Sequence, residues 1–396
     1  MRTADQHALA ALALAPEPVP VELELRHALG HVTAAPVAAR VDSPPFDNSA
    51  MDGFAVRWAE VRDATRDTPV TLTLMGESRA GVPSPETLAP GRAIRIMTGA
   101  PMPAGADTVI PLEVVGGDDH AVSILEVRSE GAHVRRRGED ARRGDQVIAA
   151  GVELSARHLA AAAAVGAARV PVFRSPRVGI LSTGDELAPL GSVLKDGQIY
   201  ESNSFLLDGA VRAAGATPVL LGPVGDRVED VVAAITGADV DLIVTTGGVS
   251  VGAYDVVKAA LAGLGVEFMT VAMQPGKPQG VGSIGGVPLL CLPGNPVSVA
   301  VSFELFVLPV IRAMRGLTQP LAWSVATAGA EWSSPDGREQ FMPVRWEGGA
   351  VVPATGGGAG SHLMARLAVA HGLARIPADV THVSVGDSLE WRRFAG

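Results

Sequence analysis

The strongest constraint on the fold is an alternation that runs from residue 176 to residue 316. Apolar, strand-like segments begin near residues 176, 217, 241, 266 and 287. Helical periodicity fills the intervals at 202–215, 227–238 and 253–265, and a long apolar helix opened by Pro296 follows at 296–316. This alternation predicts an α/β domain with a doubly wound, mostly parallel sheet.

Two other regions carry a different pattern. Residues 46–138, and residues from about 318 to the end, contain short strand-like runs separated by Gly, Pro and Asp turns. An Ala-rich helix is expected after Ser155, a residue type that caps helix N-termini. The chain is therefore expected to be multidomain, α/β plus β.

Charge and composition exclude several classes of protein. The chain has 32 Lys and Arg against 42 Asp and Glu, a net charge of −10, whereas a general nucleic-acid binder carries a basic surface. The single cysteine, Cys291, excludes intramolecular disulfides and cysteine-based metal sites. The most apolar stretch, Val297 to Met314, contains Glu304, Pro309 and Arg312, which favours a buried helix over a membrane span. We expect a cytoplasmic protein with neither nucleic acid nor membrane as a partner.

Four loops follow strands of the predicted sheet and should meet at one edge, because ligands of open α/β sheets bind at the carboxyl ends of the strands. Their amides and hydroxyls suit phosphate, and their carboxylates Glu186, Asp226 and Asp255 suit Mg²⁺. The loops are Ser182–Glu186, Gly222–Asp226, Thr245–Asp255 and Pro293–Ser298. Each loop alone is equally typical of an ordinary turn or helix cap. Ala253 and Tyr254 stand where a P-loop needs Lys and Ser or Thr, so the glycines before them form no Walker motif.

Three further loops are rich in residues with special turn chemistry. They lie at 43–53, 97–103 and 274–278. Pro, Gly, Asp, Asn and Ser are common in turns, so an ordinary turn and a binding loop are both open at this point. Lys277 is either a solvated side chain or, held by its rigid Pro/Gly loop, a contact for an oxyanion.

Taken together, these motifs resemble a known family, the MoeA-type molybdopterin molybdenumtransferases (molybdenum insertases), which include the gephyrin E domain. The resemblance covers nearly the whole chain. It is carried, in order, by PPFDNSAMDGFAVR, MTGAPMPAGADTVIPLE, RRRGEDARRGD, STGDEL, GQIYESNS, TTGGVSVGAYDVVK, PGKP and LPGNPVS.

The resemblance implies a four-domain subunit in an elongated homodimer. Domain I would be discontinuous, domain II an inserted β domain, domain III a MoaB/MogA-like α/β domain that binds molybdopterin, and domain IV a C-terminal β-barrel. In this sequence the four correspond to 1–45 with 139–172, 46–138, 173–317 and 318–396. The active site would lie between domains III and IV, closed by domain II of the other subunit.

The implied reaction converts adenylylated molybdopterin and molybdate into molybdenum cofactor, with Mg²⁺-dependent release of AMP. Glu186, Asp255 and Asp226 would bind the metal and act in catalysis. Asp52, Thr98 and Asp140 match catalytic positions contributed across the dimer. Molybdopterin adenylyltransferase and apo-molybdoenzymes are the protein partners that this reaction implies.

The resemblance also assigns substrate-binding residues. The phosphate and pterin portions would contact Thr183, Gly184, Thr246, Gly247, Gly248, Ser250, Gly252, Pro293, Asn295 and Pro296. Molybdate would bind at Lys277, Pro278, Ser298, Arg338 and Ser361. Lys and Arg donors with hydroxyls suit a tetrahedral dianion.

This chain departs from the family in the oxyanion loop. Gln274 stands where many members have Lys, and Gln279-Gly280-Val281 stands where many have aromatic residues. The loss of one cation leads to the hypothesis of a shifted choice between molybdate and tungstate. Three alternatives to insertion are a molybdopterin adenylyltransferase, a non-catalytic cofactor carrier or scaffold, and a nucleotide-dependent dehydrogenase. No G-x-G-x-x-G follows the first strand, which disfavours the last.

Overall fold

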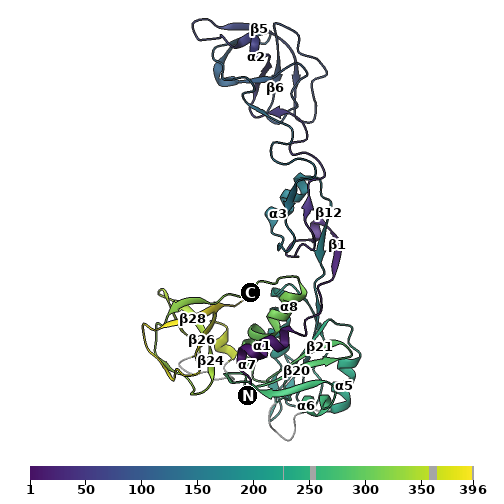
Figure 1. The fold of residues 1–396 in the computed structure, drawn as a ribbon, viewed down its shortest axis with the longest axis vertical. Helices are drawn as coiled ribbons and strands as arrows, with labels where there is room; N and C mark the ends of the chain where they lie inside the picture. The colour runs from purple at the N-terminus through teal and green to yellow at the C-terminus, as the bar shows by residue number, and fades with distance from the viewer. Residues whose placement is uncertain (226, 250–255, 356–363, 395–396) are drawn as a thin grey trace. The chain divides into compact units, whose positions relative to one another are not determined.

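The computed structural model describes residues 1–225, 227–249, 256–355 and 364–394. Their contacts divide the chain into two compact units, which are drawn in Figure 1 and described separately. Unit 1 comprises 1–21, 30–34 and 172–396, and unit 2 comprises 22–29 and 35–171. The N-terminal helix therefore belongs to the same unit as the α/β region, while the division into four domains stays a prediction.

Unit 1 is built around a six-stranded sheet with the order β16-β13-β17-β21-β20-β18. The pairs β13–β16, β13–β17 and β17–β21 are parallel, whereas β20 pairs antiparallel with both β21 and β18. The sheet is thus mostly parallel, as predicted. Its strands are β13 (Arg177–Ser182), β16 (Thr217–Leu220), β17 (Leu242–Thr246), β18 (Val266–Thr270), β20 (Pro278–Ile284) and β21 (Val287–Leu292).

Helices cover both faces of this sheet. On one face, α4 and the long C-terminal helix bury Leu207, Val211 and Phe303 in one hydrophobic cluster. On the other, α5 and α6 bury Val231, Ile235 and Val257 in a second cluster. The helices are α4 (Asn203–Ala213), α5 (Val228–Thr236), α6 (Val256–Leu261), α7 (Pro296–Ser302), a π-helical turn (Phe303–Val307) and α8 (Leu308–Met314).

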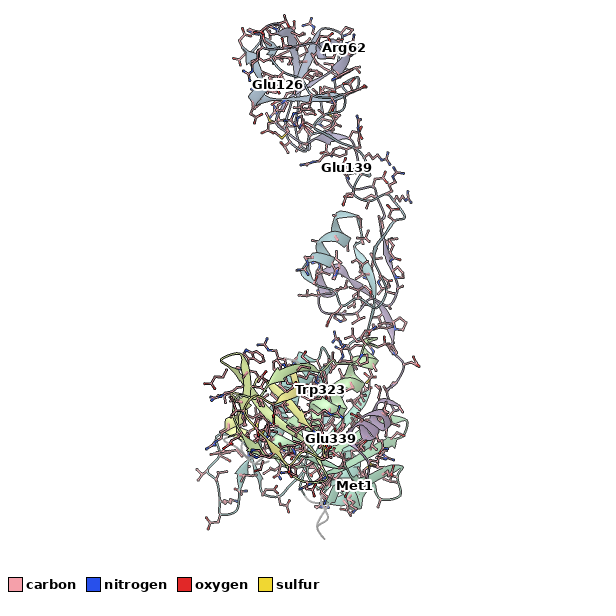
Figure 2. The ribbon with its side chains drawn as sticks, turned by 60° about the vertical axis from the view of Figure 1, so that its left-hand side comes forward. Met1, Arg62, Glu126, Glu139, Trp323 and Glu339 are labelled. Atoms are coloured by element: carbon pink, nitrogen blue, oxygen red, sulfur yellow. The ribbon has the colours of Figure 1, made fainter. Side chains whose placement is uncertain are left out.

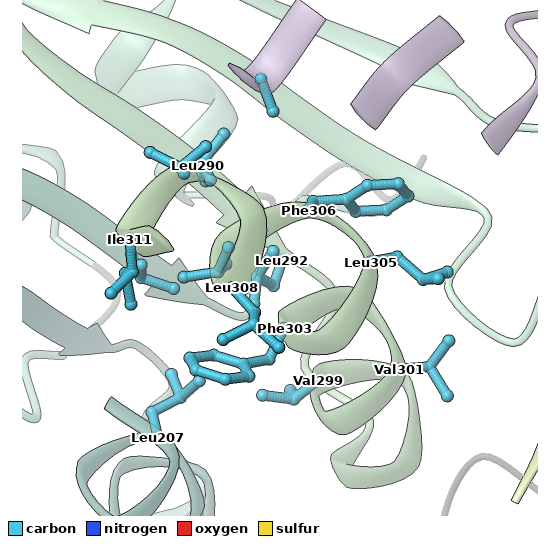
Figure 3. Close-up of a cluster of buried hydrophobic side chains, with 14 of the residues drawn as sticks. Leu207, Leu290, Leu292, Val299, Val301, Phe303, Leu305, Phe306, Leu308 and Ile311 are labelled. Carbon is cyan, nitrogen blue, oxygen red and sulfur yellow. The ribbon is translucent and has the colours of Figure 1, made fainter. Parts of the chain in front are cut away.

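The helix from Pro296 to Met314 is continuous through the π-helical turn. It is the one helix of the described residues that is long and apolar enough to cross a membrane, but 83% of it is buried inside the protein. Figure 3 shows why: Phe303 and Leu308 pack against Leu290 and Leu292 of β21 and Leu207 of α4. The prediction of a buried core helix is confirmed.

The N-terminal helix α1 (Ala4–Leu12) packs beside the same long helix (Figure 1). Its N-terminus is fixed by a capping box, in which Thr3 accepts from the N–H of Gln6 and the Gln6 side chain accepts from the N–H of Thr3. The buried ring of His7 meets Phe306 edge-on, with ring centroids 4.6 Å apart.

The C-terminal part of unit 1 is a second sheet with the order β19-β24-β26-β28-β22, and β25 pairs with β24. A bridge between Ala328, just after β22, and Val351 of β25 joins the two ends of the sheet, which therefore closes on itself. Figure 2 labels Glu339 at the start of β24 and Trp323 just before β22. The strands are β19 (Met273–Gln274), β22 (Ser324–Thr327), β24 (Glu339–Glu347), β25 (Ala350–Pro353), β26 (Gly372–Ile376) and β28 (Ser388–Arg393); smaller elements are β14 (Leu187–Ala188), β15 (Ile199–Tyr200), β23 (Trp332–Ser333), β27 (His382–Val383) and α9 (Met364–Leu367).

Unit 2 contains a six-stranded sheet with the order β7-β4-β6-β5-β9-β8. Two further ribbons, β2–β11 and β3–β10, each pair a strand that comes before this sheet in the chain with a strand that comes after it. Strand β1 pairs with β12. Helix α3 begins after Ser155, as predicted. The elements are β1 (Pro20–Glu24), η1 (Leu25–His27), β2 (Val37–Ala38), β3 (Asn48–Ser49), β4 (Gly53–Val56), α2 (Trp58–Val61), β5 (Val70–Ser78), β6 (Arg92–Ile96), β7 (Thr108–Pro111), η2 (Leu112–Val114), β8 (Val115–Gly117), β9 (Ala121–Ile124), β10 (Val134–Arg135), β11 (Gln146–Ile148), α3 (Ala156–Ala164) and β12 (Arg169–Phe173).

Candidate functional site

Three neighbouring strands end at the same level of the α/β sheet. Ser182 at the end of β13 lies opposite Thr246 of β17, and Thr246 lies opposite Leu292 of β21. The loops that follow these strands therefore start side by side at one edge. The chain runs from β13 outward to β16 and then returns to β17 on the other side, so this edge includes the switch point where ligands of such sheets bind.

A pocket of about 810 Å³ opens at this edge. That volume is within the range of small-molecule sites, roughly 300–1,000 Å³. Thirteen of the residues predicted for the site line it: Thr183, Gly184, Glu186, Thr246, Gly247, Gly248, Lys277, Pro278, Pro293, Asn295, Pro296, Ser298 and Arg338. The structure brings these residues together, and their individual roles stay predictions.

Two cations reach this pocket from the ends of two paired strands. Lys277 follows the short strand β19, which pairs in parallel with the start of β24, so that Gln274 lies opposite Gln340. This pairing brings Arg338, just before β24, to the same wall as Lys277. Within the described part of the chain, neither side chain forms an ion pair, and both cations are available to an anion.

The start of α7 forms another wall. Ser298 in its first turn is 3% exposed. The side-chain Nδ2 of Asn203 donates to the carbonyl oxygen of Gly294 at 2.8 Å and so fixes the loop before α7. Asn203 Oδ1 is buried and accepts no hydrogen bond in the described residues. The wall thus offers hydroxyl and amide groups rather than charge.

Of the three carboxylates proposed to bind the metal, Glu186 lies within the described residues. Its side chain is exposed and folds over Gly184, where an added Cβ would lie 2.4 Å from a carboxylate oxygen. Asp226 and Asp255, the other two proposed ligands, lie outside the described residues, as do Ser250, Gly252 and Ser361. Among the described residues there is no cluster of three or more His, Cys, Asp or Glu side chains suited to a metal ion.

A polar network beneath the pocket was not predicted. Glu201, only 5% exposed, accepts from Ser182 Oγ at 3.1 Å and from the Ser204 N–H at 2.9 Å, and also from the Ser204 hydroxyl. Thr246 Oγ1 donates in turn to Ser182 Oγ at 3.3 Å. The network ties the ends of β13 and β17 to the start of α4. Glu201 lies in the GQIYESNS motif, which carried the family resemblance, and Tyr200, Ser202 and Asn203 of the same motif line the pocket.

In unit 2 the two predicted loops lie against each other. Asp52 Oδ1 accepts from both the backbone N–H of Thr98 at 2.7 Å and the Thr98 hydroxyl at 2.9 Å. The Thr98 N–H, and then its hydroxyl, hold the pKa of the Asp52 carboxyl below its ordinary value. Asp140 makes a separate contact, accepting from Ser43 Oγ at 3.2 Å. Asp52 and Thr98 therefore form one site, with Asp140 held by the start of the 43–53 loop.

The cysteine behaves as a core residue. Cys291 is fully buried in β21, and burial raises the pKa of its thiol to about 12. It stays protonated at neutral pH and supplies no nucleophile.

Three family models match consecutive parts of the chain. They are the MoeA N-terminal region (domains I and II) over residues 2–166, a probable molybdopterin-binding domain over 179–313, and the MoeA C-terminal region (domain IV) over 325–394. A molybdopterin molybdenumtransferase 2 from Mycobacterium tuberculosis is 42% identical over 98% of this chain and 99% of its own length. The chain belongs to the MoeA family.

Other relatives agree with this membership. A molybdopterin molybdenumtransferase from a Nostoc species is 42% identical over 75% of this chain and 70% of its own. A crystal structure of a molybdopterin biosynthesis MoeA protein from Pyrococcus horikosii superposes with a TM-score of 0.86 at 32% identity, covering 100% of this chain and 99% of the other. The pocket described above lies in the parts matched by the molybdopterin-binding and C-terminal MoeA models.

Proposed function

We propose that this MoeA-family chain inserts molybdenum into adenylylated molybdopterin and releases AMP, as a transferase of molybdenum cofactor biosynthesis. The observation that carries the proposal is the composition of the pocket. Hydroxyl and amide groups at three strand ends face two cations, Lys277 and Arg338, that have no carboxylate partner in the described residues. In a chain of net charge −10, such a local concentration of donors favours an anionic substrate.

The pocket divides into two parts. Thr183, Gly184 and Thr246 to Gly248 offer hydroxyls and glycine backbone at the switch point, and these groups suit the phosphate and pterin portions of the substrate. Lys277, Ser298 and Arg338 offer charge-assisted donors for molybdate, with Ser361 as a further proposed contact. The two substrates would then meet where the walls from the two sheets adjoin.

Mg²⁺ is proposed to bind at Glu186 together with Asp255 and Asp226. The chemistry of the one described donor is suitable, because Glu186 is an exposed carboxylate that lines the same pocket as Thr183 and Thr246. When bound, the ion would polarise the phosphoanhydride that is cleaved to release AMP. The protein's own part is to hold that group beside Thr183 and Thr246.

The remaining proposals concern assembly and cellular context. Asp52, Thr98 and Asp140 are proposed to act on substrate bound by the other subunit of a homodimer. The ionised Asp52, already fixed by Thr98, would orient substrate or metal-bound water. The cytoplasm, molybdopterin adenylyltransferase and apo-molybdoenzymes are the proposed location and partners.

The test is a reaction with purified protein, adenylylated molybdopterin and Mg²⁺, with and without molybdate. We expect molybdate to stimulate AMP release and the product to activate a molybdenum-free apo-oxidoreductase. Consumption of ATP with molybdopterin in the absence of molybdate would instead indicate the adenylyltransferase. Bound ligand without any turnover would indicate a carrier.

A further inference from the structure

The loop that carries Lys277 is held by a buried amide that the proposed function leaves unused. Gln279 lies in β20 and is 1% exposed. Its Nε2 donates to the carbonyl oxygen of Gly276 at 2.7 Å and to Ser302 Oγ at 2.8 Å. Both N–H groups of the Gln279 amide are therefore hydrogen-bonded, one to the turn before Lys277 and the other to α7.

The geometry at Gly276 shows how closely this turn is held. Gly276 has a φ of +97°, which favours glycine, and an added Cβ would lie 3.1 Å from Ser302 Oγ and 3.4 Å from Gln279 Nε2. On its other side the turn is fixed by the carbonyl of Lys277, which accepts from the N–H of Val271 at 2.8 Å. The position of the Lys277 backbone is thus set by two contacts, of which Gln279 provides one.

The position itself would favour an apolar side chain. The central residues of β20 are buried on both faces of the sheet, where a polar amide is stable only if it is hydrogen-bonded. Gln279 Oε1 has no partner in the described residues, so the amide is not fully satisfied there. Gln279 is therefore costly to bury, yet it donates to the turn before Lys277 and to the helix that carries Ser298. These contacts indicate a role in the pocket.

We infer that Gln279 is a positioning residue for the oxyanion part of the pocket, setting the turn before Lys277 relative to α7, the helix that carries Ser298, through Ser302 at its end. This inference rests on the proposed function for the identity of the oxyanion. Gln279 itself does not line the pocket and acts through Gly276 and Ser302. Its loss should therefore weaken molybdate binding while leaving the affinity for adenylylated molybdopterin unchanged.

The sequence allows a direct readout at Lys277. The chain has only three lysines, Lys195, Lys258 and Lys277, so acetylation by acetic anhydride can be followed at each by mass spectrometry. The experiment compares the full-length wild type with Gln279→Met, which keeps the length of the side chain but loses both bonds. Thr108→Val is the matched control, because Thr108 is also a fully buried polar side chain, accepts from the N–H of Gly131 at 3.1 Å, and lies in β7 of unit 2 outside the pocket.

In Gln279→Met we expect the labelling rate of Lys277 relative to Lys195 to change without ligand. The molybdate concentration that half-protects Lys277, and the KM for molybdate, should both rise roughly tenfold, with the KM for adenylylated molybdopterin unchanged. Thr108→Val should leave all of these at wild-type values. Ser302→Ala, which removes only the α7 partner, should give an intermediate shift.

Wild-type labelling and protection of Lys277 in a folded Gln279→Met protein would overturn the inference. If Gln279→Met does not fold, Ser302→Ala decides the matter, because it removes the α7 partner of the Gln279 amide and keeps the buried glutamine. If molybdate fails to protect Lys277 even in the wild type, the proposed oxyanion site is wrong. In that case the positioning role of Gln279 is still tested by comparing the labelling rate of Lys277 in the wild type and in Gln279→Met without ligand.

Discussion

Two glycines with nearly the same backbone conformation allow the geometry of the pocket to be tested. Gly247 has a φ of +92° and lines the pocket after β17, whereas Gly286 has a φ of +85° in the turn between β20 and β21. A Cβ at Gly247 would lie 2.7 Å from the carbonyl oxygen of Thr183, but a Cβ at Gly286 would meet nothing within 4 Å. Gly247→Ala and Gly286→Ala therefore both place an alanine at a positive φ, and only Gly247→Ala adds a steric contact, with Thr183.

The magnitudes follow from these contacts. Placing alanine in the left-handed region costs about 1–2 kcal/mol in free energy of unfolding for either variant. In Gly247→Ala the Thr183 carbonyl must also move by several tenths of an ångström, because ordinary Cβ contacts begin at 3.4 Å. A displacement of that size at a substrate-positioning group should lower kcat/KM by roughly tenfold or more.

The assay is molybdate-dependent AMP release, together with chemical denaturation of both variants. We expect Gly286→Ala to keep wild-type kcat/KM and Gly247→Ala to lose most of it, with Gly247→Ala the less stable of the two because only it carries the clash with Thr183. Equal activity of the two variants would refute the reasoning, since it would mean that the Thr183–Gly247 contact does not shape the substrate site.

Three other predictions follow from particular side chains. Arg338→Gln should raise the KM for molybdate about tenfold or more, because it removes one charge-assisted hydrogen bond to the anion. Arg345→Gln, which removes an arginine paired with Glu347, should leave this KM unchanged. Equal effects of the two variants in steady-state kinetics would contradict the assignment of Arg338. Phe303→Ala should lower the free energy of unfolding of unit 1 by about 3–5 kcal/mol in a denaturant titration, because Phe303 is 2% exposed and lies in the core. A loss below about 1 kcal/mol would contradict this role of Phe303 in the core. The Asp52–Thr98 bonds should persist at the ordinary pKa of an aspartate and break only at lower pH, because Thr98 lowers the pKa of the folded Asp52 carboxyl and the bonds weaken as that carboxyl is protonated. In NMR, the chemical shift of the Thr98 amide should follow this titration in the wild type, and the hydrogen-bonded shift should be absent already at neutral pH in Asp52→Ala.

The α/β region was predictable because its two periodicities are long and clear. The buried helix of 296–314, the sheet strands β13, β17 and β21, and the meeting of their loops all follow from apolar segments and their order. Strand β20 was missed, because its sequence is rich in glycine. The structure explains those glycines: a Cβ at Gly282 would lie 2.2 Å from the carbonyl oxygen of Gly265.

The site was predictable only in part, for a physical reason. Lys277 and Arg338 are 61 positions apart, and their meeting depends on the pairing of β19 with β24, which local sequence does not encode. The roles of Glu201 and Gln279 were not predicted, because each acts by hydrogen bonds to distant segments, Glu201 to Ser182 and Gln279 to Ser302. Their residue types alone carry no such information.

The central claim is that the oxyanion binds between Lys277 and Arg338. The most direct measurement is a crystal structure with bound tungstate, located by its anomalous scattering. The account predicts a peak within hydrogen-bond distance of Lys277, Arg338 and Ser298. A peak only in a second pocket, lined by Trp323, Arg312, Arg375 and Arg392, would contradict it.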